Sequence, residues 1–114
     1  MEDSYIPDRG DVMWINLYPQ AGHEQAGRRP VIVLSPAKYN GTVGMAILCP
    51  ITTQIKGYPF EVKIPSDPKI SGVVLSDQVK CLDWKVRKAE YICKLHSKII
   101  EEVLKKLNTL LSYK

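Results

Sequence analysis

Short strand-like runs fill most of this chain, and helical periodicity is confined to its C-terminal end. The runs are rich in aliphatic, β-branched and aromatic side chains, and they fall at residues 11–16, 31–34, 45–51, 60–64, 72–84 and 85–95. Proline, glycine and asparagine separate many of them. At least five short strands therefore precede any convincing helix, which predicts a mainly β fold.

The connections between the runs are also predicted from their composition. Val31 to Leu34 contain no polar side chain, which indicates a strand buried on both faces, and Ser35-Pro36 end it. Ala37 to Gly44 contain Asn40-Gly41 and are predicted to form a turn. Residues 66–72 are predicted to be a surface connection, and residues 72–84 either a short strand pair or one bent strand.

The C-terminal helix is predicted from apolar residues that recur at three- and four-residue spacing. These residues are Ile99, Ile100, Val103, Leu104, Leu107, Leu110 and Leu111. Ser97 is the expected N-cap, and Glu101–Lys105 and Glu102–Lys106 are the expected ion pairs along the exposed face. Short strands followed by one helix indicate an SH3-like barrel of strongly bent antiparallel strands, with a single domain over residues 1–114.

Length and charge restrict the class of protein. A chain of 114 residues with 45% hydrophobic side chains suits one compact domain, and dimerisation would help to cover its apolar surface. The polar N-terminus and the absence of a long apolar run predict a soluble, cytoplasmic protein that does not enter a membrane. The net charge of +4 permits an anionic partner, although the basic residues are spread along the chain.

The three cysteines do not suggest a metal site. Cys49, Cys81 and Cys93 are far apart and lack both the CxxC spacing and the histidine pattern of a zinc site. They are expected to be reduced and packed, and we expect no metal or other cofactor.

Four ordered blocks of the sequence resemble one known family. The blocks are YIPDRGDVMWINLYP, EQAGRRPVIVLSP, PITTQIKGYPFEV and LSDQVKCLDW, followed by the final helix. Together they are similar to the MazF/PemK family of toxin endoribonucleases from type II toxin–antitoxin modules. The resemblance implies a homodimer that cleaves single-stranded RNA, including mRNA, sequence-specifically and without a metal. It also implies that an acidic, partly disordered MazE-like antitoxin inhibits the protein.

The resemblance also implies the residues of the site. The arginine of the Gly-x-Arg-Pro element corresponds to Arg29, the threonine after the third strand to Thr52, and the acidic residue beside Gln-Ala-Gly to Glu24. These three are the expected catalytic residues. The expected RNA-binding residues around them are Arg28, Gln25, Thr53 and Gln54.

The chemistry of these side chains agrees with such a site. A nuclease without metal can use the substrate's 2′-hydroxyl as nucleophile, so the protein must move protons and stabilise charge on phosphorus. Arg29 suits phosphate because its guanidinium is always protonated and donates in a fork, but for the same reason it is a poor base. Glu24 could be that base, and the Thr52 hydroxyl could donate to the same phosphate.

Structural explanations compete with several of these assignments. Arg28 could be an accessory phosphate contact or a surface charge, and Glu24 could simply pair with it. The loop residue His23 is left outside the catalytic set, and His96 is expected to be structural or exposed. Aromatic residues sometimes stack on RNA bases, but Trp14 and Trp84 are assigned to packing or to the dimer contact.

Two other functions remain open at this stage. A non-enzymatic gyrase poison of the CcdB class would share the fold, but the Arg29–Thr52 pair and the lack of a C-terminal tryptophan disfavour it. A nucleic-acid-binding barrel without catalysis is the third possibility, which the lack of a concentrated basic stripe disfavours.

Overall fold

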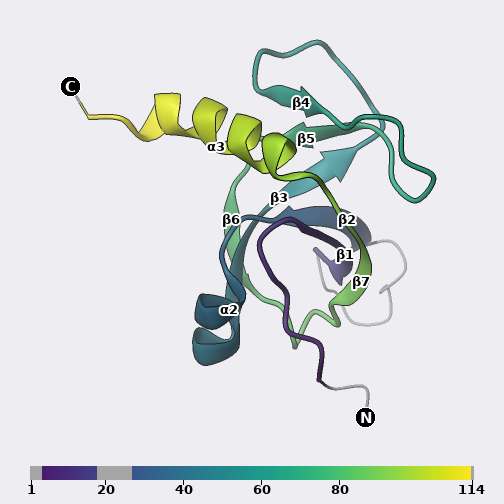
Figure 1. The fold of residues 1–114 in the computed structure, drawn as a ribbon, viewed down its shortest axis with the longest axis vertical. Helices are drawn as coiled ribbons and strands as arrows, with labels where there is room; N and C mark the ends of the chain where they lie inside the picture. The colour runs from purple at the N-terminus through teal and green to yellow at the C-terminus, as the bar shows by residue number, and fades with distance from the viewer. Residues whose placement is uncertain (1–3, 18–26, 114) are drawn as a thin grey trace.

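The fold is mainly β, with a helix at the C-terminal end. The computed structural model describes residues 4–17 and 27–113 of the chain. In chain order the elements are β1 (Asp11–Asn16), β2 (Arg28–Val33), α2 (Ala37–Val43), β3 (Met45–Thr52), β4 (Glu61–Lys63), β5 (Val73–Leu75), β6 (Lys80–Asp83), β7 (Glu90–Lys94) and α3 (Ser97–Leu111). The predicted succession of short strands and one long C-terminal helix is confirmed (Figure 1).

All strand pairs are antiparallel, and the sheet order is β4-β5-β3-β2-β1-β7. The first half of β3 pairs with β6, and its last two residues pair with β5. Residues 72–84 therefore form two strands that lie along different parts of β3. Within the described residues no ladder joins β4 to β7, so closure of the sheet into a barrel stays a prediction.

Hydrophobic side chains cover both faces of the central strands. Val12 and Ile32 belong to one buried cluster, together with residues of β3, β4, β5 and α3. Met13, Val31 and Val33 belong to a second cluster that includes Trp84. The predicted burial of the second strand on both faces is therefore confirmed.

Strand β2 begins earlier than the sequence predicted. The pattern placed its start at Val31, where the aliphatic run begins. In the structure, β2 pairs with β1 from Arg28 onward, with Pro30 opposite Trp14. Arg28 and Arg29 therefore lie within the strand and take their orientation from the sheet.

The turn predicted over Ala37 to Gly44 is wrong, because this segment forms α2. Asn40 is fully buried and acts as an anchor: its Nδ2 donates to the carbonyl oxygens of Pro7 and Ser35, and its Oδ1 accepts from the Ser35 hydroxyl. Gly44 ends the helix with a left-handed φ of 81°. Asn-Gly favours a turn in local sequence, but here the contacts of Asn40 with Pro7 and Ser35 fix it inside a helix.

Helix α3 packs beside β4, and its C-terminal end projects away from the sheet (Figure 1). His96, rather than Ser97, is the N-cap, and its Nδ1 accepts from the Lys98 N–H. Ile99, Ile100, Val103 and Leu107 are buried, whereas Leu104, Leu110 and Leu111 are exposed.

The two ion pairs predicted along α3 do not form among the described residues. Lys106 instead donates to the carbonyl oxygens of Pro59 and Glu61, at 2.7 and 3.0 Å. No salt bridge joins Glu101 to Lys105 in this part of the chain. The two carbonyls beside β4 offer Lys106 partners that sequence spacing along the helix cannot reveal.

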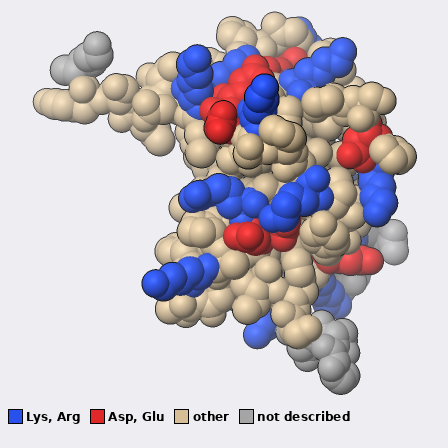
Figure 2. Space-filling view, in the orientation of Figure 1, with Lys and Arg blue, Asp and Glu red and all other residues tan. Residues whose placement is uncertain are grey.

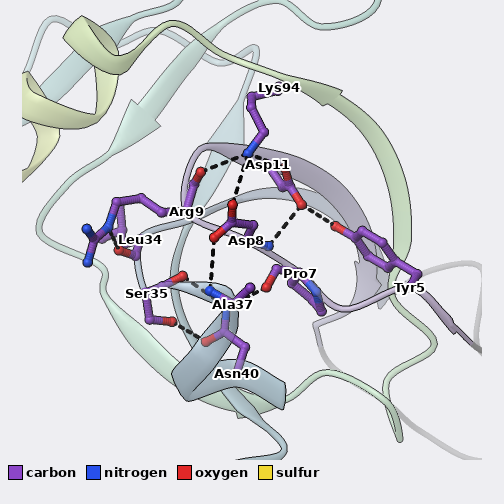
Figure 3. Close-up of polar contacts among 10 residues, drawn as sticks. All are labelled: Tyr5, Pro7, Asp8, Arg9, Asp11, Leu34, Ser35, Ala37, Asn40 and Lys94. Carbon is purple, nitrogen blue, oxygen red and sulfur yellow. Dashed lines mark hydrogen bonds and ion pairs between the residues drawn. The ribbon is translucent and has the colours of Figure 1, made fainter. Parts of the chain in front are cut away.

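A polar cluster fixes the N-terminal segment against the sheet (Figure 3). The buried carboxylate of Asp11 accepts from the Tyr5 hydroxyl at 2.8 Å and from the Asp8 N–H at 2.9 Å. Lys94 on β7 forms ion pairs with Asp11 and Asp8, at 3.0 and 3.5 Å. Asp8 also accepts from the Ala37 N–H, so the same cluster ties α2 to the N-terminal segment.

The cysteines are all free, as expected, but they are not all packed. Cys49 is buried, Cys93 is half-buried and Cys81 is exposed on β6. In the part of the chain that the structure describes, no helix is long and apolar enough to span a membrane.

Candidate active site

A hollow of about 580 Å³ lies where β2 begins and β3 ends. The loop that joins β4 to β5 and one residue of β1, Trp14, contribute the rest of its wall. Its lining residues are Trp14, Arg29, Pro30, Ile51, Thr52, Thr53, Gln54, Asp67, Pro68, Lys69, Ile70 and Ser71. Four of the seven residues predicted for the site, Arg29, Thr52, Thr53 and Gln54, are therefore brought together here.

Arg29 is an exposed strand residue whose side chain lines the hollow. Its position in β2 is opposite Ile15 of β1. One guanidinium nitrogen, Nη1, donates to the carbonyl oxygen of Arg28 at 2.9 Å. Among the described residues Arg29 forms no ion pair, so most of its donors are available to an anion.

Thr52 is the last residue of β3, where the strand pairs with β5. It lies opposite Val73, and its half-buried side chain faces a turn. The Thr52 hydroxyl oxygen accepts from the Gln54 N–H at 3.1 Å. Because this contact uses only the oxygen, the hydroxyl proton can be donated to a bound group. The same turn brings Thr53 and Gln54, both exposed, to the rim.

Gly72 allows the β4–β5 loop to approach the end of β3 closely. Its φ is +112°, and a Cβ at this position would lie 2.2 Å from the carbonyl oxygen of Thr52. Only glycine meets both conditions without displacement of the backbone. Gly72 therefore fixes the spacing between the loop and Thr52.

Arg28 does not line the hollow. Its guanidinium donates to the Asn16 side chain, to the Lys88 carbonyl oxygen and to Glu90, each at 3.0 Å, and it forms a salt bridge with Glu90. Through these contacts Arg28 joins β2 to β1 and β7, which is a structural role. An RNA contact by Arg28 stays a prediction.

Three residues that the sequence analysis discussed lie outside the described residues. They are the proposed base Glu24, the predicted RNA-binding residue Gln25, and His23. The suggested pairing of Glu24 with Arg28 therefore stays untested.

The two tryptophans differ in their surroundings. Trp84 is 7% exposed and its indole N–H donates to the Asn40 carbonyl oxygen, which confirms its predicted role in packing. Trp14 is 39% exposed and lines the hollow, so packing within this chain does not account for it. His96 is both exposed and structural, as predicted.

The β4–β5 loop contributes polar residues that the sequence analysis missed. Asp67, Lys69 and Ser71 line the hollow, although residues 66–72 were predicted as a surface connection and none of them was assigned to the site. These residues reach the hollow because the following strand, β5, pairs with the end of β3. Sequence alone does not reveal that register.

On the face drawn in Figure 2, the charges of the described residues do not form a single basic stripe. Figure 2 shows lysine and arginine side chains in separate groups on one face, with acidic side chains among them. Among the described residues no group of His, Cys, Asp or Glu is arranged to hold a metal ion. Within the hollow, the cations are Arg29 and Lys69 and the carboxylate is Asp67.

Comparisons with known proteins identify relatives over nearly the whole chain. The endoribonuclease toxin MazF of Escherichia coli K12 is 49% identical over 89 residues, which cover 78% of this chain and 79% of the relative. The endoribonuclease PemK of Escherichia coli is 32% identical over 109 residues, which cover 92% of this chain and 82% of the relative.

Solved structures agree with this relationship. A crystal structure of MazF from Deinococcus radiodurans superimposes with a TM-score of 0.86 at 50% identity, covering 96% of this chain and 99% of that one. A MazE–MazF complex from the same organism gives 0.85 at 44% identity, with the same coverage. The family model for the PemK-like, MazF-like toxins of type II toxin–antitoxin systems matches residues 8–111, and the chain belongs to this family.

Proposed function

We propose that Arg29 and Thr52 are the catalytic pair with which this toxin endoribonuclease cleaves single-stranded RNA. The observation that carries the proposal is their meeting in one open hollow, from the start of β2 and the end of β3. No carboxylate of the described residues forms an ion pair with Arg29, and the Thr52 hydroxyl keeps its proton for donation. Together these two side chains are suited to hold a phosphate.

In this mechanism the substrate supplies its own nucleophile. The 2′-hydroxyl attacks the adjacent phosphorus, and negative charge develops on the non-bridging oxygens. Arg29 stabilises that charge through its forked donors, and Thr52 donates its hydroxyl proton to the same phosphate in a hydrogen bond. The bond from phosphorus to the 5′-oxygen then breaks, and the departing oxygen takes a proton from water, which leaves a 2′,3′-cyclic phosphate and a 5′-hydroxyl.

The proton of the 2′-hydroxyl requires an acceptor, and Arg29 is unsuited to that role because it stays protonated. We assign the role to Glu24, on the basis of the family resemblance. Gln25, Thr53 and Gln54 would contact the strand on either side of the cut, and Arg28 would add a phosphate contact at the edge of the site. No metal ion takes part in this mechanism.

The same hollow would serve the antitoxin. An acidic, partly disordered MazE-like peptide carries carboxylates that Arg29 and Lys69 can bind in place of phosphate. Toxin and antitoxin would then act in the cytoplasm, where mRNA is the substrate. We also expect a homodimer, because a small domain gains stability by covering apolar surface. The family resemblance implies that the two subunits share one RNA path.

The proposal is tested by Arg29→Ala and Thr52→Ala, measured as single-turnover cleavage of a long single-stranded RNA. Each variant should lose about 100-fold or more in rate, the cost of removing a donor to a developing oxyanion. Each should unfold close to the wild-type midpoint, because neither side chain is in the core. A variant that folds normally and cuts at the wild-type rate would remove its residue from the site.

Arg9→Ala is the matched control for the arginine. Arg9 is likewise exposed and donates to one backbone carbonyl, that of Leu34, but it does not line the hollow. Its replacement should leave the rate within about twofold of wild type, since surface substitutions away from a site have small effects. An equal loss of activity in Arg9→Ala would show that the cleavage rate depends on the overall positive charge of the protein rather than on an arginine in the hollow.

A further inference from the structure

Trp14 is an aromatic surface without a structural task among the described residues. Trp14 is 39% exposed and lines the hollow, and its indole N–H has no hydrogen-bond partner in this part of the chain. Trp84, by contrast, is buried and donates to Asn40. An exposed tryptophan face in a site for single-stranded RNA is suited to stacking on a base, because every base has a π-face.

Asp67 poses an electrostatic problem for an RNA site. Its carboxylate lines the same hollow, where it would repel the phosphates of a bound strand. One oxygen, Oδ1, accepts from the Lys69 N–H at 2.7 Å, which fixes the side chain in a local turn. No lysine or arginine of the described residues forms an ion pair with it.

A negative group is compatible with RNA where it accepts hydrogen bonds from a base. The exocyclic amino groups of adenine, cytosine and guanine are such donors, and carboxylates bind the cytosine amino group in nucleic-acid complexes. At the corresponding exocyclic position, uracil presents an oxygen that a carboxylate repels. The oxygen of Asp67 that the turn leaves free therefore suits an amino-bearing base and disfavours uracil.

We propose that Trp14 and Asp67 form a base-recognition subsite beside the cleavage pair, in which Trp14 stacks on one base and Asp67 selects for its amino group. This inference rests on the proposed function and adds to it a determinant of sequence preference. Trp14 and Asp67 act on the substrate in this scheme, but neither transfers a proton in the cleavage step.

The test compares RNAs that differ by one group. A panel of short oligonucleotides carries cytidine or uridine at each position flanking the cut, and kcat/KM is measured for each member. Wild type should favour cytidine at one position by about tenfold or more, which is the effect of one hydrogen bond to a charged group. Asp67→Asn keeps an oxygen for the Lys69 N–H but removes the charge, so the preference should fall toward unity at that position alone.

Asp83→Asn is the matched control. Asp83 also caps a turn, accepting from Lys85 and Val86, but it does not line the hollow. Its replacement should leave the preference unchanged. The assignment of Asp67 would be overturned if Asp67→Asn keeps the wild-type preference, or if its kcat/KM falls equally on all substrates.

Stacking by Trp14 is measured separately. Trp14→Ala should lower kcat/KM by roughly 5- to 150-fold on a normal substrate, the range expected for loss of one stacked base. On an RNA with an abasic nucleotide at the selected position, wild type and Trp14→Ala should be equal. An undiminished difference on the abasic RNA would show that Trp14 only supports the fold.

Failure of the proposed function and failure of the subsite give different experimental results. If wild type cuts no long single-stranded RNA, the proposed function is wrong. If wild type cuts and prefers no base at any flanking position, the function stands and the subsite is wrong.

Discussion

Replacement of Gly72 by alanine should disturb the site from a residue that touches no substrate. The new Cβ would lie 2.2 Å from the Thr52 carbonyl oxygen, 2.8 Å from its carbonyl carbon and 3.2 Å from the Thr53 Cα. All three contacts are to backbone, so rotation of a side chain cannot relieve them. The φ of +112° is an added strain for any residue with a Cβ.

The magnitude follows from these distances. Real Cβ contacts essentially never fall below 3.0 Å, so the loop and the end of β3 must separate by roughly 0.8 Å. The backbone strain alone costs about 1–3 kcal/mol. Displacement of the pairing between β3 and β5 adds to this, so the free energy of unfolding should fall by about 2–5 kcal/mol. A misplacement of about 1 Å in a catalytic group can lower the rate about 100-fold.

The assay is urea unfolding together with single-turnover RNA cleavage, measured where more than nine-tenths of the variant is folded. Gly44→Ala is the control, because Gly44 also has a positive φ, of +81°, but has no atom within 4 Å of the added Cβ. It should lose about 1 kcal/mol and keep its rate. If Gly72→Ala matches Gly44→Ala in both stability and rate, the close approach does not position Thr52.

Two further predictions concern the polar cluster and the partner. The Ala37 N–H hydrogen bond lowers the pKa of Asp8 below its ordinary 3.8. The ionised carboxylate therefore stabilises the fold above pH 3.8. This stabilisation is lost as the pH falls through the lower pKa that Asp8 has in the folded protein. Asp8→Asn should therefore reduce the free energy of unfolding at pH 7, and urea titrations should show the difference from wild type shrinking as the pH falls below 3.8; a constant difference would contradict this. A cognate acidic antitoxin peptide should displace a non-cleavable RNA analogue, and simultaneous binding of both with undiminished affinity would exclude a shared groove.

Much of the fold could be predicted because local pattern and tertiary structure agree over most of the chain. Val31 to Val33 are aliphatic and lie in a strand with both faces buried. The wrong prediction at residues 37–44 has a definite cause, since Asn40 is satisfied by Pro7 and Ser35 rather than by its own turn. Such long-range partners leave no trace in local spacing.

The site could be predicted only in part, and the reason is again register. Arg29 and Thr52 were found through their motifs, and the hollow contains both. Asp67 and Lys69 were missed because nothing local indicates that β5 pairs with the end of β3. Arg28 is adjacent to Arg29 in sequence, yet its guanidinium is bonded to Asn16 and Glu90 and lies outside the hollow, which the motif does not reveal.

The most direct test of the mechanism removes one 2′-hydroxyl group from the substrate. An RNA that carries a single 2′-deoxy nucleotide on the 5′ side of the cut is incubated with the protein in excess EDTA, alongside the unmodified RNA. If the 2′-hydroxyl is the nucleophile and Arg29 and Thr52 hold the phosphate, only the unmodified RNA should be cut at that site, giving 2′,3′-cyclic phosphate and 5′-hydroxyl ends. Cleavage of the deoxy-substituted RNA at the same position, or complete loss of activity in EDTA, would contradict the mechanism.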